Sequence, residues 1–378
     1  NENLPSSTSM TLTGGKIWGE VSEGFLSTLK NNLTAGGKTY RPVSLWVNWP
    51  VTDNSKQHLI LGGGEKFLHP NVDPSLLSGI MLNPMQQSEP SKIALFSGAQ
   101  YSWKQWKSEE EAKKINDIAF NFVENGHFED SKVSAAFREL GKHMINQNMD
   151  TRVVKLEESV DLAPKLTDFM TKLKAGQDVT AERAALRAEF AKIKEAAELY
   201  KASGDKKMVA QIHYWLDNAI DQMNALDAFL TGTEAMATND AAKLWDSYYK
   251  GLKLYEQSQT HTFHYVDHME KAELGVQHIR PFILSLKEVL ASEVQKVLHP
   301  DQIISTFITN RTGVEGGLAE VTDGDLATHA IIKSPNSIKT GDYIGMKFNK
   351  PVAIQTLTFA MGTQANPRDT FSKAEVQY

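Results

Sequence analysis

Aromatic and polar side chains that could bind a sugar stand together near residue 50. Trp46, Asn48 and Asp53 lie where a predicted strand runs into a turn. Sugars need this combination, because their C–H faces stack on aromatic rings while their hydroxyls bond to amides and carboxylates. A carboxylate such as that of Asp53 is a particularly strong acceptor for a sugar hydroxyl. An ordinary core tryptophan beside capping residues would give the same pattern, so this alternative stays open.

A second segment with candidate binding groups, residues 82–92, precedes a predicted helix. Asn83 comes directly before Pro84, which pushes the asparagine out of the α region and leaves it on extended or turning backbone. The Ser-Glu-Pro-Ser sequence at 88–91 then favours the start of a helix. A plain junction between a loop and a helix is the alternative interpretation.

Three stretches of different composition must position these residues. Residues 10–105 predict an α/β region, residues 106–299 predict a helical bundle, and residues 300–378 predict part of an antiparallel β-sandwich. In the first stretch the β-prone runs are Lys16–Val21, Val43–Asn48, His58–Leu61 and Ile93–Leu95. In the last stretch strands are expected at Tyr343–Phe348 and Ala353–Phe359.

The middle stretch carries apolar stripes at helical spacing, which would bury one face of each helix against its neighbours. Ser108 and Glu111 predict a capping box that begins a helix ending near Gly126. The first clear stripe precedes an expected helix end at Gly204 and consists of Leu186, Phe190, Ile193, Ala197 and Tyr200. The second precedes an expected helix end at Gly232 and consists of Met208, Ile212, Trp215, Ala219, Met223, Leu226 and Leu230. Further helices are expected around 131–146, 155–174, 240–258 and 265–298.

The overall composition excludes several classes of function. The chain has 40 basic and 46 acidic residues, a net charge of −6, which argues against a nucleic-acid-binding protein. It has no cysteine, which excludes a disulfide scaffold, a thiol nucleophile and cysteine-ligated metal. No apolar run approaches the ~18 residues typical of a membrane span. The polar start, Asn1–Ser9, has no signal-peptide pattern and leaves the compartment open.

Two clusters are candidates for metal binding. His261, His264 and His268 have spacings that would place them on one helical face, where zinc is conceivable. Without a His-Glu-x-x-His motif, a polar layer between helices is the favoured interpretation. Asp323, Asp325 and Thr328 fall in a predicted turn, and such oxygen ligands suit calcium, although Asp-Gly turn chemistry alone would explain them.

Together the motifs resemble the last strands of the catalytic barrel of glycoside hydrolase family 84. That family includes bacterial β-N-acetylglucosaminidases and clostridial hyaluronidase-type toxins. The resemblance rests on Trp46-Val47-Asn48-Trp49-Pro50-Val51-Thr52-Asp53, on Asn83-Pro84-Met85 with Glu89-Pro90-Ser91-Lys92, and on Ala99-Gln100-Tyr101-Ser102-Trp103. His58-Leu59-Ile60-Leu61-Gly62-Gly63-Gly64 and Phe67-Leu68-His69-Pro70 look closer to the hyaluronidase-type branch.

This resemblance implies an architecture of three parts. Residues 1–105 would be the C-terminal part of a (β/α)8 catalytic barrel, and residues 106–299 the helical bundle domain that follows it. Residues 300–378 would be the N-terminal part of a discoidin-like carbohydrate-binding sandwich, whose relatives often hold calcium near the position of Asp323, Asp325 and Thr328.

The resemblance also implies roles for four residues. Asp53 and Asn83 would bind sugar hydroxyls, Trp46 would form the aromatic wall near the N-acetyl group, and Asn48 would bond close to the reacting centre. All four are binding roles. Family enzymes catalyse with two adjacent aspartates on an earlier strand, and retain configuration through an oxazoline intermediate without a cofactor. The sequence contains no Asp-Asp pair.

The implied protein is a secreted or cell-surface bacterial glycosidase. It would act on β-linked N-acetylglucosamine in glycoconjugates or hyaluronan. Its barrel-like part has about 95 residues, whereas a whole barrel takes roughly 250. Catalysis would therefore need a preceding barrel half. The alternative is a non-catalytic fragment whose helical and sandwich parts bind glycans or partners.

Overall fold

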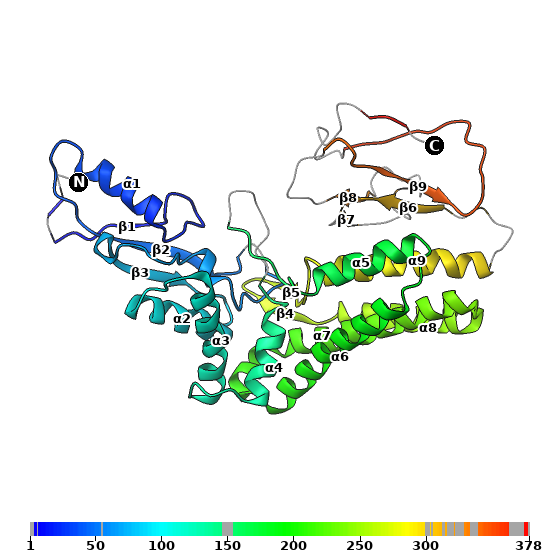
Figure 1. Cartoon of the computed structure of the whole chain (residues 1–378), viewed down its shortest axis with the longest axis horizontal. Coiled ribbons are helices and arrows are strands. Elements are labelled where there is room, and N and C mark those ends of the chain that lie inside the picture. Colours follow the sequence, from blue (N-terminus) through cyan, green and yellow to red (C-terminus); the bar gives the residue numbers. More distant parts are fainter. Residues whose placement is uncertain are drawn as a thin grey trace. The chain divides into compact units, whose positions relative to one another are not determined.

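The computed structural model describes residues 4–5, 7–53, 56–145, 154–298, 303, 305–311, 314–315, 321, 329–332, 339–362 and 374–376. These residues form two compact units, Asn1–Lys287 and Glu288–Tyr378. Figure 1 shows the helices and strands of both. Among the helices that are described, none is long and apolar enough to cross a membrane.

A parallel sheet begins the first unit. Its strands are β1 (Thr11–Leu12), β2 (Val43–Pro50) and β3 (Leu77–Asn83), in that order. Helix α1 (Glu23–Thr34) connects β1 to β2, and α2 (Ser88–Trp103) follows β3. Parallel strands joined by helices are the repeating unit of α/β folds, and three strands are too few to close into a barrel. The short helices η1 (Gly64–Lys66) and η2 (Pro74–Leu76) lie between β2 and β3.

Only one of the four strands predicted in this region is found as predicted. Val43–Asn48 lies in β2, where alternate side chains from Val43 to Trp49 are buried. Lys16–Val21 and His58–Leu61 are loop segments, although Val21 forms an isolated bridge with Leu68. Ile93–Leu95 lies inside α2, because a short apolar run fits a buried helix as well as a strand.

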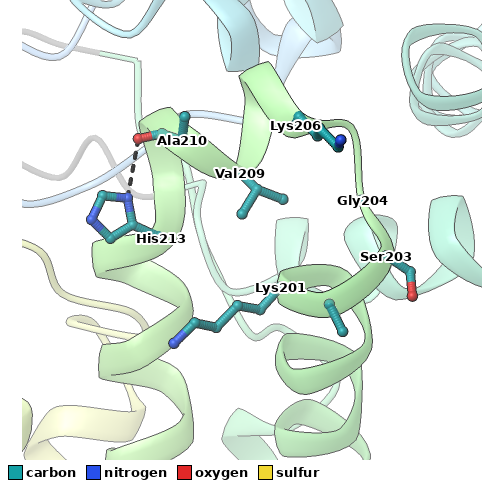
Figure 2. A pocket seen from close by; sticks show the side chains of 8 residues that line it. Lys201, Ser203, Gly204, Lys206, Val209, Ala210 and His213 are labelled. Carbon is teal, nitrogen blue, oxygen red and sulfur yellow. Dashed lines mark hydrogen bonds between the residues drawn. The ribbon is translucent and has the colours of Figure 1, made fainter.

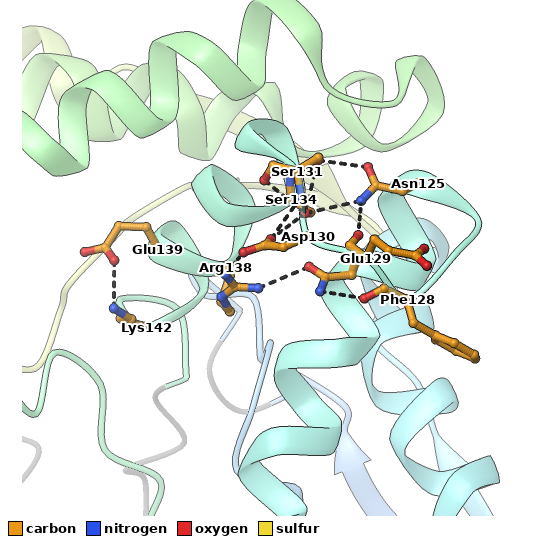
Figure 3. Close-up of polar contacts among 10 residues, drawn as sticks. Asn125, Phe128, Glu129, Asp130, Ser131, Ser134, Arg138, Glu139 and Lys142 are labelled. Carbon is orange, nitrogen blue, oxygen red and sulfur yellow. Dashed lines mark hydrogen bonds and ion pairs between the residues drawn. The ribbon is translucent and has the colours of Figure 1, made fainter.

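The helices that follow the sheet begin and end at recognisable signals. The hydroxyl of Ser108 accepts from the backbone N–H of Glu111, but the Glu111 carboxylate accepts from the backbone N–H of Lys107, so only half of the predicted capping box forms. Helix α3 (Glu109–Asn125) ends before Gly126 in the left-handed conformation, as predicted. Helix α4 (Lys132–Gly141) begins at a capping box of Ser131 and Ser134. Figure 3 shows this polar network, in which Arg138 also binds Asp130 at 2.8 Å.

The two striped helices are the longest of the first unit. Helix α6 (Thr180–Ser203) stops at Gly204, and all the residues of both predicted stripes are buried. Helix α7 (Lys206–Thr238) does not stop at Gly232 as predicted. A single glycine costs a helix about 1 kcal/mol, which packing of a buried segment offsets. Helix α5 (Ala163–Lys174) packs against α6, and α7 packs against both α6 and α8 (Ala241–Ser258).

A β-hairpin replaces the start of the last predicted helix. Strands β4 (Thr262–Tyr265) and β5 (His268–Lys271) are antiparallel, and α9 (Ile279–Leu298) begins only after them. Buried Phe263 and Tyr265 flank exposed His264, a period of two that belongs to a strand. The prediction of one helical face for His261, His264 and His268 is therefore wrong.

The described part of the second unit contains two small antiparallel ladders. Strand β6 (Ser305–Thr309) pairs with β9 (Ile344–Phe348), and β7 (Val314–Glu315) pairs with β8 (Ile331–Ile332). The strand predicted at Tyr343–Phe348 is thus found, whereas Ala353–Phe359 forms no strand. Asp323, Asp325 and Thr328 lie outside the described residues.

Candidate functional site

Asn48 joins the candidate residues of β2 to the candidate residue of β3. Its Oδ1 atom accepts hydrogen bonds from Trp46 Nε1 at 2.7 Å and from Asn83 Nδ2 at 3.0 Å. Its Nδ2 atom donates to the main-chain oxygen of Ile17 at 2.6 Å. Trp46 and Asn48 share one face of β2 because they are two residues apart. The structure therefore brings three of the four predicted site residues together, with Asn48 and Asn83 near the carboxyl-terminal ends of neighbouring strands and Trp46 in the middle of β2.

The two tryptophans of β2 have opposite environments. The side chain of Trp49 is fully buried, donates from Nε1 to the oxygen of Gly62 at 2.9 Å, and stacks on Phe67. Trp46 is 42% exposed, and its indole N–H is held by Asn48. The interpretation as an ordinary core tryptophan therefore describes Trp49. Trp46 has a fixed orientation and an accessible ring, which are the properties that stacking on a sugar requires.

Asp53, the fourth predicted residue, is exposed on the loop that follows β2. No hydrogen bond joins it to Trp46, Asn48 or Asn83 among the described contacts. Its Oδ1 atom instead accepts from the hydroxyl of Tyr265, which lies 212 positions later in β4, at 3.2 Å. Burial, followed in size by the effect of Asp53, raises the pKa of Tyr265 to about 12, so this hydroxyl stays protonated and donates.

Sequence reasoning missed the contribution of the β4–β5 hairpin to this end of the sheet. The amide Nε2 of Gln86, after β3, donates to the oxygen of His264 at 2.9 Å. The amide Nε2 of Gln57, after β2, donates to Glu270 Oε1 at 2.9 Å. The hairpin therefore contacts the loops that carry the candidate residues. The alternation around Phe263 was the signal that could have revealed it, had the segment not been predicted as helix.

The three histidines of the hairpin region do not converge on a metal site. His261 Nε2 pairs with Asp221 Oδ2 of α7 at 2.8 Å, while His268 pairs with Asp267 and Glu270. No group of three or more His, Cys, Asp or Glu side chains suited to a metal occurs in the part of the chain that the structure describes. The His261–Asp221 pair is instead a polar contact between a helix and the hairpin.

A pocket of about 500 Å³ lies away from these residues, at the turn between α6 and α7. Figure 2 shows Lys201, Gly204, Lys206 and His213 around it, with His213 Nδ1 against the oxygen of Ala210 at 3.0 Å. Lys201 is already paired with Asp217. None of the predicted site residues lines this pocket.

Two family models match successive parts of the chain. Residues 1–141 match a beta-N-acetylglucosaminidase family, and residues 161–262 match a hyaluronidase post-catalytic domain-like family. The first match continues past residue 105, and the predicted domain boundaries at 105 and 299 stay predictions.

Solved structures share the fold at low sequence identity. CpGH84D is 24% identical with a TM-score of 0.67, over 76% of this chain and 46% of its own. CpGH84B is 22% identical with a TM-score of 0.58, and the match covers 75% of this chain and 46% of CpGH84B. A mutant of the Thermobaculum terrenum O-GlcNAc hydrolase is 16% identical with a TM-score of 0.60, and the match covers 80% of this chain and 59% of the hydrolase. The chain thus spans about half the length of these proteins.

The order of the two matched domains is the order expected of a glycosidase catalytic domain followed by its helical neighbour. The structural matches extend over three quarters of the chain or more. The two domain matches therefore support a relationship between this chain and β-N-acetylglucosaminidases of the glycoside hydrolase family 84 type.

Proposed function

We propose that the chain is part of a glycoside hydrolase that cleaves at β-linked N-acetylglucosamine in glycoconjugates or hyaluronan. The observation that carries the proposal is the shared acceptor Asn48 Oδ1, which holds Trp46 and Asn83 on adjacent strands. An accessible indole ring beside two amides matches both faces of a sugar, the C–H face and the hydroxyl edge.

Each of the four residues has a proposed binding role. Trp46 forms the wall beside the N-acetyl group, and Asn48 bonds close to the reacting centre. Asn83 donates to or accepts from sugar hydroxyls, and the carboxylate of Asp53 accepts from them as the strongest acceptor. These contacts orient the sugar so that its own acetamide can reach the anomeric carbon, which is a contribution of positioning to catalysis.

The proposed reaction is substrate-assisted hydrolysis with retention. The acetamide oxygen attacks the anomeric carbon as the glycosidic C–O bond breaks; one carboxylic acid protonates the departing oxygen, a second carboxylate takes the N–H proton of the acetamide, and an oxazoline forms. Water then attacks the anomeric carbon and opens the oxazoline, with the first carboxylate taking the proton of that water and the second returning its proton to the acetamide nitrogen. The two adjacent aspartates that family members use for these steps are not among the 378 residues. They would have to come from other strands of the barrel.

The lack of an Asp-Asp pair among the 378 residues also favours a second candidate function. A chain without an Asp-Asp pair could bind glycans or partners through its helical and sandwich parts without hydrolysing them. Secretion or cell-surface display by a bacterium and a structural calcium ion at Asp323, Asp325 and Thr328 are further proposals. They rest on the resemblance to family members alone.

The test uses the polypeptide encoded by the whole gene that contains residues 1–378. We expect it to release the chromophore from an aryl N-acetyl-β-glucosaminide, and Asp53→Ala to reduce kcat/KM sharply, because the site loses its strongest hydroxyl acceptor. Asp246→Ala, on the exposed surface of α8, is the matched control. If Asp53→Ala kept the kcat/KM of the wild type, the assignment of Asp53 to a sugar-binding site would be wrong.

Product analysis distinguishes the remaining alternatives. Proton NMR of the first-formed sugar reports whether configuration is retained, and the size of products from a hyaluronan polymer separates internal from terminal cleavage. Sugar binding without any hydrolysis would favour the non-catalytic candidate.

A further inference from the structure

The β4–β5 hairpin supplies a buried donor to an exposed carboxylate. Tyr265 is 8% exposed, and its hydroxyl lies 3.2 Å from Asp53 Oδ1. Asp53 itself is exposed and projects from a loop. A buried ring on a strand has little freedom, whereas an exposed loop carboxylate can rotate. The hydrogen bond therefore restrains the more mobile partner.

Several contacts hold the Tyr265 ring in place. The ring packs edge-on against Phe263, which in turn lies against Trp215 of α7. The ammonium group of Lys56, in the segment that follows β2, lies 5.2 Å from the centre of the Tyr265 ring. The Gln86 and Gln57 hydrogen bonds anchor both hairpin strands to the loops after β3 and β2. The hydroxyl is thus presented to Asp53 by a rigid frame.

The geometry points to Tyr265 as a positioning residue for Asp53, through which the hairpin becomes part of the sugar-binding site. This inference rests on the proposed function. Tyr265 occupies one lone pair of Oδ1 and selects one rotamer of the carboxylate, which leaves Oδ2 to accept a sugar hydroxyl. Because the hydroxyl donor is neutral, it orients the carboxylate without cancelling the charge that makes Asp53 a strong acceptor.

The experiment measures kcat and KM of the whole gene product with an aryl N-acetyl-β-glucosaminide and with its 4-deoxy and 6-deoxy analogues. The proteins compared are the wild type, Tyr265→Phe, Asp53→Asn and the double variant. Tyr265→Phe removes only the hydroxyl and keeps the ring that packs against Phe263. Tyr249→Phe, the same change on the exposed face of α8, is the matched control. Thermal unfolding midpoints of all variants are measured in parallel.

We expect Tyr265→Phe to lower kcat/KM for the parent sugar about fivefold to twentyfold, the usual effect of one lost hydrogen bond in a site. The double variant should be no worse than Asp53→Asn, because Tyr265 acts only through the Asp53 carboxylate, which Asp53→Asn already removes. With the deoxy analogue that lacks the hydroxyl bound by Asp53, Tyr265→Phe should have almost no effect. A purely structural role of Tyr265 would instead lower activity towards all three substrates equally.

The outcomes separate this inference from the proposed function. An active wild type that is impaired by Asp53→Asn but not by Tyr265→Phe overturns the inference alone. Additive effects of the two substitutions, or equal losses on all three substrates, also overturn it. An inactive wild type, or an Asp53→Asn variant with wild-type kinetics, overturns the proposed site and the inference with it.

Discussion

The indole Nε1 of Trp215, in the N-terminal third of α7, donates a hydrogen bond to the main-chain oxygen of Gln57 at 2.8 Å. The same oxygen accepts from the backbone N–H of Glu273 at 3.0 Å, just after the hairpin. Gln57 belongs to the loop that carries Asp53. These two bonds join the loop after β2 to the helical part of the chain, and both sides of position 105 belong to one compact unit.

Trp215→Phe should therefore destabilise the protein. The change removes one hydrogen bond and leaves a cavity beside a fully buried ring, and we expect the free energy of unfolding to fall by about 2–3 kcal/mol. Urea denaturation followed by circular dichroism measures it. Trp245→Phe, on the exposed surface of α8, should change the value by less than about 0.5 kcal/mol. Equal effects of the two substitutions would contradict this account.

Asn48→Ala should disturb three contacts at once. Trp46 and Asn83 would lose their common acceptor, and the oxygen of Ile17 would lose its donor. We expect kcat/KM of the whole gene product to fall at least about tenfold, because misoriented binding groups no longer position the sugar. Asn32→Ala, exposed on α1, serves as the control. If Asn48→Ala kept wild-type kinetics, the shared acceptor would have no role in the site.

Trp46→Leu and Trp49→Leu should separate binding from stability. Trp46 is exposed, so its replacement should leave the unfolding midpoint almost unchanged while kcat/KM falls through loss of ring stacking. Trp49 is buried and hydrogen-bonded to Gly62, so its replacement should cost about 3 kcal/mol or more of stability. Calorimetry and initial rates on the same samples test the pair. The opposite assignment of effects would show that Trp46 is structural.

Glu158→Gln should change how stability depends on pH. Complete burial raises the pKa of Glu158 to about 8, against the hydrogen bonds that its carboxylate accepts from the backbone of Gln277 and His278. The folded state therefore holds a proton that the unfolded chain releases near pH 4.5. The stability from this group is complete below about pH 4.5 and is lost as the pH rises through about 8.

Urea titrations between pH 5 and 8.5 measure this dependence. The free energy of unfolding of the wild type should decline across that range, and Glu158→Gln should show a flatter curve. His58 and His143 act in the opposite sense, because burial lowers the pKa of each to about 4. Their contribution is lost as the pH falls from about 6.5 towards 4. Parallel curves for the wild type and Glu158→Gln would argue against a buried protonated Glu158.

Local sequence patterns determined much of the helical architecture. The stripes from Leu186 to Tyr200 and from Met208 to Leu230 are buried because helical periodicity depends only on spacing along one chain. The stop at Gly204 and the cap at Ser108 are equally local. Short segments were less predictable: Ile93–Leu95 lies in a helix and residues 262–271 form a hairpin. A run of three or four residues fits both periods, so packing against its neighbours determines its secondary structure.

The candidate site could also be predicted only in part from the sequence. Trp46, Asn48 and Asn83 could be selected as candidates from the sequence, because the resemblance to family 84 implies binding roles that their residue types by themselves leave open. Only the tertiary structure could show that Asn48 holds the other two, or that Trp46 is accessible while Trp49 is buried. The partner of Asp53 is 212 positions away in Tyr265. No local pattern encodes such a contact, because it arises from the packing of the hairpin and α7 against the loops after the strands.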